Sequence, residues 1–248
     1  METPTETNSP SAQGNASGSV PTRRVPPRRG GGLYPAAVNL AGCNKTWHQM
    51  MVPKAGSSFV TDFLKASDHC CGKVRWHFHT GLYQPCSFAT LREPCSRAVS
   101  SFAHLREEYP KFWPGLASTA DEYVAALQVH WAQVLHHRVR MVGWDRHLVL
   151  AMPQHLWIGN SSKVMCTERL DEELPAWFRE IGCCKVATIA EVKANGPSYR
   201  STSRSGTLTP SQANLSEASC AAVRELYSED WLLYQRLCGG RTGLEKRD

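Results

Sequence analysis

The 248-residue chain has no run of 18 or more apolar residues and no Cys-x-x-Cys pair. A transmembrane helix needs about 20 apolar residues, so we expect no membrane-spanning segment in the sequence as it stands. The missing Cys-x-x-Cys pair argues against a zinc ribbon or a thioredoxin-type redox centre. Glycine and proline follow no collagen-like period, and 42% hydrophobic residues exclude a wholly disordered chain. The length fits one domain with a tail.

Cysteine, by contrast, is abundant, with 10 residues that include the neighbouring pairs Cys70-Cys71 and Cys183-Cys184. Disulfides in an oxidising compartment would account for this number, and buried free thiols are the alternative. Asn-x-Ser/Thr sequons support the first interpretation, and they begin at Asn15, Asn44, Asn160 and Asn214. We therefore expect a disulfide-bonded glycoprotein of the Golgi lumen or secretory pathway. No signal peptide is recognisable, so membrane association is expected only if an N-terminal anchor is missing from this sequence.

Residues 1–32 are rich in proline, glycine, serine and arginine, which predicts a disordered basic tail. The folded domain is predicted at residues 33–240, with a short C-terminal tail at 241–248. Lysine and arginine number 28 against 22 acidic residues, and the net charge of +6 favours an anionic partner. Charge alone does not choose between a nucleotide, a sulfated glycan, a nucleic acid and a membrane surface.

Short apolar runs predict strands at 47–52, 87–91, 147–152 and 163–166. Apolar residues at helical spacing predict helices at about 57–64, 98–105, 119–135, 171–181, 216–227 and 230–238. Strands that alternate with helices indicate an α/β domain with a mainly parallel central sheet flanked by helices.

The first strand-to-helix junction reads Pro53-Lys54-Ala55-Gly56-Ser57-Ser58-Phe59. A helix N-terminus offers unpaired N–H groups and the positive end of the helix dipole, which together bind anions. Gly56 lets the backbone approach a ligand closely, the two serines supply hydroxyl groups, and Lys54 supplies a positive charge. It is not a Walker A loop, because the lysine precedes the glycine. An ordinary Ser-capped helix with a surface lysine is the alternative.

The second junction reads Leu91-Arg92-Glu93-Pro94-Cys95-Ser96-Arg97 and continues into a helix that contains Ser100. Arg92 follows a strand, and open α/β sheets bind ligands at the carboxyl ends of their strands. Its guanidinium can make two parallel bonds to a phosphate, and Ser100 is close enough in such a turn to share that phosphate. For Arg97 we expect only an ion pair on the surface of its helix.

Together and in this order, the two junctions resemble the motifs of sulfotransferases that use 3′-phosphoadenosine-5′-phosphosulfate (PAPS), most closely the Golgi carbohydrate branch. Thr167-Glu168-Arg169 and Asp230-Trp231-Leu232-Leu233-Tyr234 are similar to further segments of that branch, and the resemblance covers about residues 46–238. It implies a P-loop-like three-layer fold, PAPS as donor, the bisphosphate PAP as product, and a glycan or glycoprotein rather than a nucleic acid as partner. It also implies that Lys54, Ala55, Gly56, Ser57, Ser58 and Phe59 bind the phosphosulfate and that Arg92 and Ser100 bind the 3′-phosphate.

Sulfo transfer also needs a general base for the acceptor hydroxyl, whereas no metal is expected. His77 and His79 alternate as they would on one face of a strand, and the pair resembles the His-x-His of uronyl 2-O-sulfotransferases. A structural pair, or a metal pair with a nearby cysteine, is the alternative. Asp62 is the second candidate, at an offset from Lys54 similar to that of the catalytic glutamate of glucosaminyl sulfotransferases. Five other histidines are expected to be packing or surface residues, namely His48, His104, His130, His136 and His137.

The resemblance also implies a catalytic role for Lys54, which would stabilise the oxygen that leaves with PAP. Two other classes of function stay open. A P-loop-like nucleotide kinase would need a lysine inside the loop and an acidic magnesium ligand after a strand. A non-catalytic protein that binds sulfated glycans or another polyanion would need only the positive charge.

Overall fold

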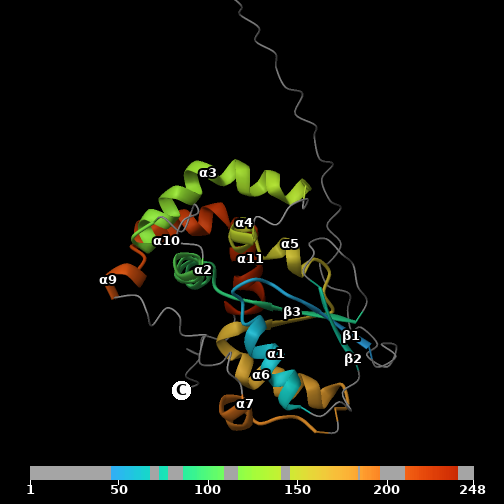
Figure 1. Ribbon diagram of the computed structural model, residues 1–248. Coiled ribbons are helices and arrows are strands. Elements are labelled where there is room, and N and C mark those ends of the chain that lie inside the picture. The colour runs from blue at the N-terminus through green and yellow to red at the C-terminus, as the bar shows by residue number, and fades with distance from the viewer. Residues whose placement is uncertain are drawn as a thin grey trace, which may run out of the picture. The chain divides into compact units, whose positions relative to one another are not determined.

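The centre of the fold is a parallel sheet of four strands in the order β2-β1-β3-β4 (Figure 1). The computed structural model describes residues 46–67, 73–77, 86–108, 117–140, 146–183, 185–195 and 210–239. The strands are β1 (Thr46–Met50), β2 (Lys73–His77), β3 (Ser87–Leu91) and β4 (Lys163–Cys166). The predicted α/β class and the parallel sheet are therefore confirmed.

Helices occupy the connections between the strands and the C-terminal part of the chain. The helix α1 (Ser57–Ala66) follows β1, and α2 (Pro94–Glu108) follows β3. The segment between β3 and β4 continues with α3 (Ala120–Arg140), α4 (Arg146–Ala151) and α5 (His155–Ile158). A 3₁₀ turn, Thr167–Arg169, follows β4 and leads into α6 (Leu170–Glu180), α7 (Ile189–Asn195), α9 (Pro210–Ala213), α10 (Glu217–Leu226) and α11 (Ser228–Leu237).

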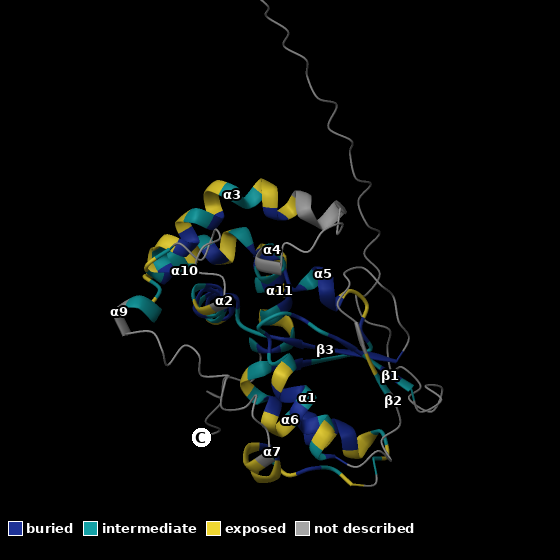
Figure 2. Cartoon of the chain, viewed as in Figure 1, coloured by how far each residue is buried: buried dark blue, intermediate teal, exposed yellow. Residues whose placement is uncertain are grey.

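The helices form a layer on each face of the sheet (Figure 1). On one face, α1, α6 and α7 enclose a cluster that includes Phe63, Phe88 and Trp177. On the other face, helices α2 to α5, α10 and α11 enclose a second cluster that includes Ala89 and Leu91. Neighbouring residues of β3 thus serve opposite cores, as the two-residue period of a strand requires. The central strand β3 is buried along its whole length and β1 and β4 are buried in part, whereas the outer side of α3 is exposed (Figure 2).

The predicted strand at 147–152 is wrong, because Arg146–Ala151 forms α4. A six-residue apolar run is compatible with a buried strand and with a buried helix, and periodicity does not distinguish them. Side chains, and not a neighbouring strand, satisfy the carbonyl groups at the end of this segment. Arg97 donates to the carbonyl oxygens of Leu150 and Met152, and Tyr227 donates to that of Ala151 over 2.6 Å.

Disulfides connect α2 and β4 to the C-terminal part of the chain. Cys95 in α2 is bonded to Cys220 in α10, with the Cα atoms 5.5 Å apart, and Cys166 at the end of β4 is bonded to Cys238 with the Cα atoms 5.8 Å apart. Cys86 and Cys183 are disulfide-bonded as well. Free thiols do not occur among the cysteines that the structure describes, so the predicted disulfides are confirmed there.

The predicted tails, 1–32 and 241–248, and the predicted domain limits lie outside the described residues. None of the helices in the described part of the chain combines the length and the hydropathy that a bilayer span requires.

Candidate functional site

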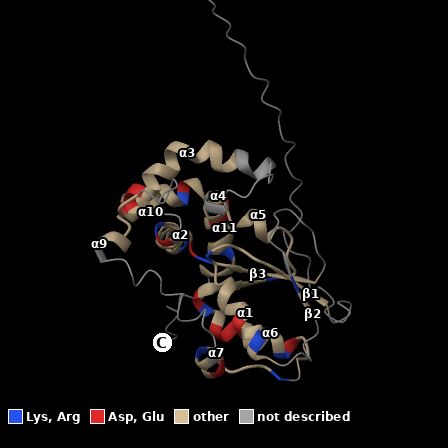
Figure 3. Cartoon of the chain, viewed as in Figure 1, with Lys and Arg blue, Asp and Glu red and all other residues tan. Residues whose placement is uncertain are grey.

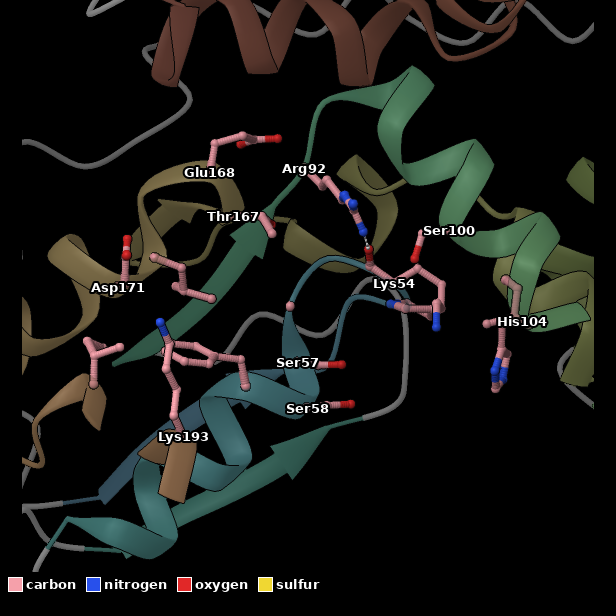
Figure 4. A pocket seen from close by; sticks show the side chains of 16 residues that line it. Lys54, Ser57, Ser58, Arg92, Ser100, His104, Thr167, Glu168, Asp171 and Lys193 are labelled. Carbon is pink, nitrogen blue, oxygen red and sulfur yellow. Dashed lines mark hydrogen bonds between the residues drawn. The ribbon is translucent and has the colours of Figure 1, made fainter. Parts of the chain in front are cut away.

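A cavity of about 490 Å³ opens where β1, β3 and β4 end (Figure 4). Its walls come from the three segments that follow these strands, together with residues of α2 and α7. The chain runs from β1 outward to β2 and then returns to β3 on the other side of β1. The connection that leaves β1 thus leads to β2 on one side, and the connection that leaves β3 leads to β4 on the other side. Such a switch point in strand order is where open α/β sheets form their ligand crevice.

The segment after β1 presents the N-terminus of α1 to this cavity. Gly56 has a φ of 85°, and it precedes the helix without a side-chain cap, so the expected Ser cap is absent. A Cβ atom on Gly56 would lie 2.9 Å from Cδ2 of Leu170, so a glycine is needed for space as well as for backbone conformation. Ser57 and Ser58, the first two residues of the ten-residue helix, line the cavity next to Lys54. The first turn thus offers N–H and hydroxyl donors beside a lysine.

Arg92 directly follows β3 and projects into the cavity (Figure 4). Its Nη1 atom donates a hydrogen bond to the carbonyl oxygen of Lys54 over 3.4 Å. Burial lowers the pKa of the Arg92 guanidinium, and the neighbouring Glu168 carboxylate opposes this effect. An arginine in a protein nevertheless stays protonated, so a half-buried positive charge faces the cavity at neutral pH.

Arg97 is buried, although a surface ion pair was expected for it. Its guanidinium donates to three carbonyl oxygens, those of Pro53 (3.0 Å), Leu150 (3.1 Å) and Met152 (2.7 Å). The side chain is only 3% exposed, so these bonds stabilise a charge that solvent does not reach. Arg97 therefore holds the segment after β1 against α2 and the end of α4.

The segment after β4 forms the third wall. The Thr167 hydroxyl lies 3.2 Å from the carbonyl oxygen of Ala55 and 3.1 Å from that of Leu91, so it connects the ends of all three strands. Glu168 accepts a hydrogen bond from the backbone N–H of Glu93 over 3.1 Å and another from the Tyr234 hydroxyl. Burial of the Tyr234 hydroxyl raises the pKa of Tyr234, and the negative charge of Glu168 raises it further. At the junction of β3 and α2, basic and acidic residues lie next to one another (Figure 3).

The cavity brings together seven of the residues that the two motifs predicted, and Figure 4 shows them around one space. The cavity is lined by Lys54, Gly56, Ser57, Ser58, Phe59, Arg92 and Ser100. Ala55, which was predicted with them, is fully buried and is not part of the lining.

The predicted bases are placed less favourably. Asp62 is 3% exposed in the middle of α1, where its carboxylate lies 3.8 Å from the ammonium of Lys65, and it is not part of the cavity lining. His77 ends β2, the edge strand beside β1, and its side chain is not among those described. His79 lies outside the described residues.

Sequence reasoning missed several residues of the lining. His104, which was expected to pack or to lie on the surface, lines the cavity four residues after Ser100 (Figure 4). That spacing puts both on one face of α2, and it is a signal that the sequence contains. The opposite end of the cavity includes Asp171 and Lys193, and no local pattern connects these to the motifs, because they come from α6 and α7.

One group of potential metal ligands occurs in the described part of the chain. It consists of Glu93, Cys95 and Cys220, whose ligand atoms lie within 4.8 Å of one another. Both cysteines are consumed by their disulfide and offer no thiolate, so we place no metal there.

Comparisons of the chain with protein-family models, with curated proteins and with solved structures gave no match. The two motifs and the geometry of the cavity that they share are therefore the observations that bear on function.

Proposed function

We propose that the chain is a PAPS-dependent sulfotransferase with a P-loop-like fold, which transfers a sulfo group to a hydroxyl of a glycan. One observation carries the proposal. Residues of two motifs, whose lead residues Lys54 and Arg92 are 38 positions apart in sequence, line a single cavity at the switch point of a parallel sheet. A cavity of about 490 Å³ is within the range of roughly 300–1,000 Å³ that small-molecule sites occupy.

The donor has two anionic groups, and the cavity has a matching set of cationic and hydrogen-bonding groups. We assign the phosphosulfate to Lys54 and to the first turn of α1 at Ser57 and Ser58, and the 3′-phosphate to Arg92 and Ser100. The apolar wall of Phe59, Leu170 and Ile189 suits the flat adenine base.

The reaction is an in-line displacement at sulfur. The acceptor oxygen forms a bond to sulfur as the bond from sulfur to the bridging phosphate oxygen breaks, and that electron pair leaves with PAP. Lys54 stabilises the negative charge that develops on the leaving oxygen. The hydroxyl proton passes to a base, for which we select His104, because it lines the cavity at the end where Lys54 and Ser100 lie (Figure 4).

The compartment is part of the proposal. Disulfides in the described residues indicate a secreted or lumenal protein. We place it in the Golgi lumen because glycan sulfation of the proposed type belongs there.

The test is transfer from radiolabelled PAPS to a panel of glycosaminoglycan acceptors. We expect Lys54→Ala and Arg92→Ala each to lower transfer by about 10²–10³-fold. The first removes a charge at the leaving oxygen, and the second removes the charge that positions the donor through its 3′-phosphate. The exposed residues Lys185 and Arg179 provide matched controls, and Lys185→Ala and Arg179→Ala should leave the rate unchanged. Equal rates in all five proteins would refute the assignment.

Binding is measured in parallel. PAP at a hundred times its Kd should stabilise the wild type by about 2.7 kcal/mol, because it binds only the native state.

A nucleotide kinase is the first alternative function, and one observation favours it. Glu168 and Asp171 follow β4 and line the cavity, where a kinase would hold its magnesium ion. Stabilisation by ATP and Mg²⁺ but not by PAP would favour that kinase. Heparin binding that survives Lys54→Ala and ignores PAP would favour a polyanion-binding protein.

A further inference from the structure

Gln154 is a fully buried polar residue whose side chain contacts the main chain of Arg92 on both sides. Its Oε1 atom accepts a hydrogen bond from the Arg92 N–H over 3.0 Å, and its Nε2 atom donates to the Arg92 carbonyl oxygen over 2.8 Å. The two residues are 62 positions apart, and Gln154 is 0% exposed. An amide side chain thus pairs with Arg92 as a neighbouring strand would.

Arg92 needs such a partner because the sheet ends just before it. The register of β3 with β4 extends only to the pair Leu91 and Cys166, and that of β3 with β1 ends at Ala89. A buried backbone group without a partner costs about 1–3 kcal/mol. Gln154 removes that cost and fixes the direction in which the Arg92 side chain leaves the backbone.

Gln154 is itself held by Asp230. The carboxylate of Asp230 accepts from the backbone N–H of Gln154 over 2.7 Å with one oxygen, and from the backbone N–H of His155 over 2.8 Å with the other. The second oxygen also lies 2.7 Å from Nδ1 of His155. Asp230 is 0% exposed, so its charge depends on these bonds, and they place it at the N-terminus of α5.

We propose that Gln154 and Asp230 are positioning residues that aim the Arg92 guanidinium and thereby give the cavity its preference for a 3′-phosphorylated nucleotide. The inference rests on the proposed function, because it takes the 3′-phosphate as the ligand of Arg92. It assigns a role to Asp230, a buried carboxylate that is not part of the cavity lining. A planar guanidinium makes its two bonds to phosphate only in a narrow range of directions, so a small shift of the backbone weakens both.

The test compares PAP with adenosine 5′-monophosphate (AMP), which has the same base, ribose and 5′-phosphate but no 3′-phosphate. The Kd of each nucleotide is measured by calorimetry on the wild type, Arg92→Ala, Gln154→Met and Asp230→Asn. Methionine has a similar length to glutamine but makes neither bond, and Asn keeps the shape of Asp230 without its charge. We expect the preference for PAP over AMP to fall about tenfold in Gln154→Met and Asp230→Asn, with little change in the Kd of AMP.

A general loss of stability is separated from positioning by a control and by a double mutant. Ser67 is 4% exposed and accepts a hydrogen bond from the N–H of Ala187 over 3.1 Å, on the other face of the sheet. Ser67→Ala should therefore lower the melting temperature without changing the preference for PAP. In the Arg92→Ala background, Gln154→Met should lower the preference no further, because both changes act through one side chain.

The outcomes separate the two proposals. A wild type that binds PAP no better than AMP overturns both the proposed function and this inference. A preference that disappears in Arg92→Ala but persists in folded Gln154→Met and Asp230→Asn overturns the positioning role and leaves the proposed function standing. If either variant does not fold, the other decides.

Discussion

Arg97 donates a hydrogen bond from Nε to the carbonyl oxygen of Pro53 over 3.0 Å. The bond joins α2, which follows β3, to the segment that follows β1, so both motif segments are connected within the protein itself. Because the donor is a buried cation and the acceptors are carbonyl oxygens, the connection is strong and depends on direction. The cavity between the segments is therefore preorganised, as a site that holds reactants in a fixed geometry requires.

Arg97→Lys should destabilise the protein although it keeps the charge. A lysine ammonium cannot reproduce the planar fork that reaches three carbonyl oxygens, so at least one of them loses its donor in a buried site. We expect the free energy of unfolding in urea to fall by about 2–4 kcal/mol. The same exchange at the exposed Arg179 should change it by less than about 0.5 kcal/mol. Equal stabilities would show that the Arg97 bonds contribute little.

Gly56→Ala should impair both folding and ligand binding. Alanine is strained at a φ of 85°, and its Cβ would lie 2.9 Å from Leu170 Cδ2. Gly182 has a φ of 83° and open space around it, so Gly182→Ala isolates the backbone effect. We expect each to lose about 1–3 kcal/mol of stability from backbone strain, and Gly56→Ala to lose more. Only Gly56→Ala should lose PAP binding. If it keeps PAP binding, a close approach of the Gly56 backbone to the ligand is not required.

His104→Gln should lower kcat/KM for sulfo transfer by about 10²–10⁴-fold, because the amide cannot accept the hydroxyl proton. The Kd of PAP should stay the same. His130, whose ring lies 3.2 Å from Gln133 on α3, provides the control variant His130→Gln. An unchanged kcat/KM in His104→Gln would return the search for the base to His77 and His79.

The Cys166–Cys238 disulfide should stabilise the fold by constraining the unfolded chain. It joins residues 72 positions apart, and a loop of that length corresponds to about 4 kcal/mol in the chain-entropy model. The double variant Cys166→Ser/Cys238→Ser should therefore unfold at a lower urea concentration than the wild type. The Cys95–Cys220 disulfide spans 125 positions, and because the dependence on length is logarithmic its removal should cost nearly the same. A large difference between the two variants would point to native-state contacts instead.

Asp121 should contribute stability that is lost in acid. Hydrogen bonds from the Ser219 side chain and the Ser216 backbone hold the pKa of Asp121 below its ordinary value. A lowered pKa stabilises the fold above the unfolded value, and the effect disappears as the pH falls through the folded value. Asp121→Asn should thus be less stable than the wild type at pH 7, by about 1 kcal/mol or less because the site is accessible to solvent. The two proteins should be nearly equal in stability at pH values below the folded pKa of Asp121. Unfolding in urea at several pH values measures this difference, and a constant gap would contradict the prediction.

Much of the architecture could be predicted, because its signals are local. The strands at Thr46–Met50, Ser87–Leu91 and Lys163–Cys166 are short apolar runs that end at turn residues, and the helices after them have a clear period. The segment Arg146–Ala151 was the exception, since its helix is favoured by side-chain donors that come from α2 and α10–α11. Such donors leave no trace in the segment itself.

The candidate site divides in the same way. Gly56, Ser57 and Arg92 were predictable as lining residues because a helix N-terminus and the carboxyl end of a parallel strand are common places for ligands in α/β folds. Gln154 and Asp230 were not assigned a role, because the bonds that connect them to Arg92 span 62 and 76 positions. Asp62 has the expected sequence offset, yet the turn of α1 directs it into the protein rather than toward the cavity.

The order of the amino acids is enough to predict the alternation of strands and helices and to single out two segments as candidate anion-binding loops, since both depend on residues that are neighbours along the chain. Only the folded protein shows that both segments share one cavity, that Arg97 and Gln154 hold it together, and that His104 faces it. Those arrangements depend on how the sheet orders its strands and how the helices pack on it, and that choice is made by burial summed over the whole core.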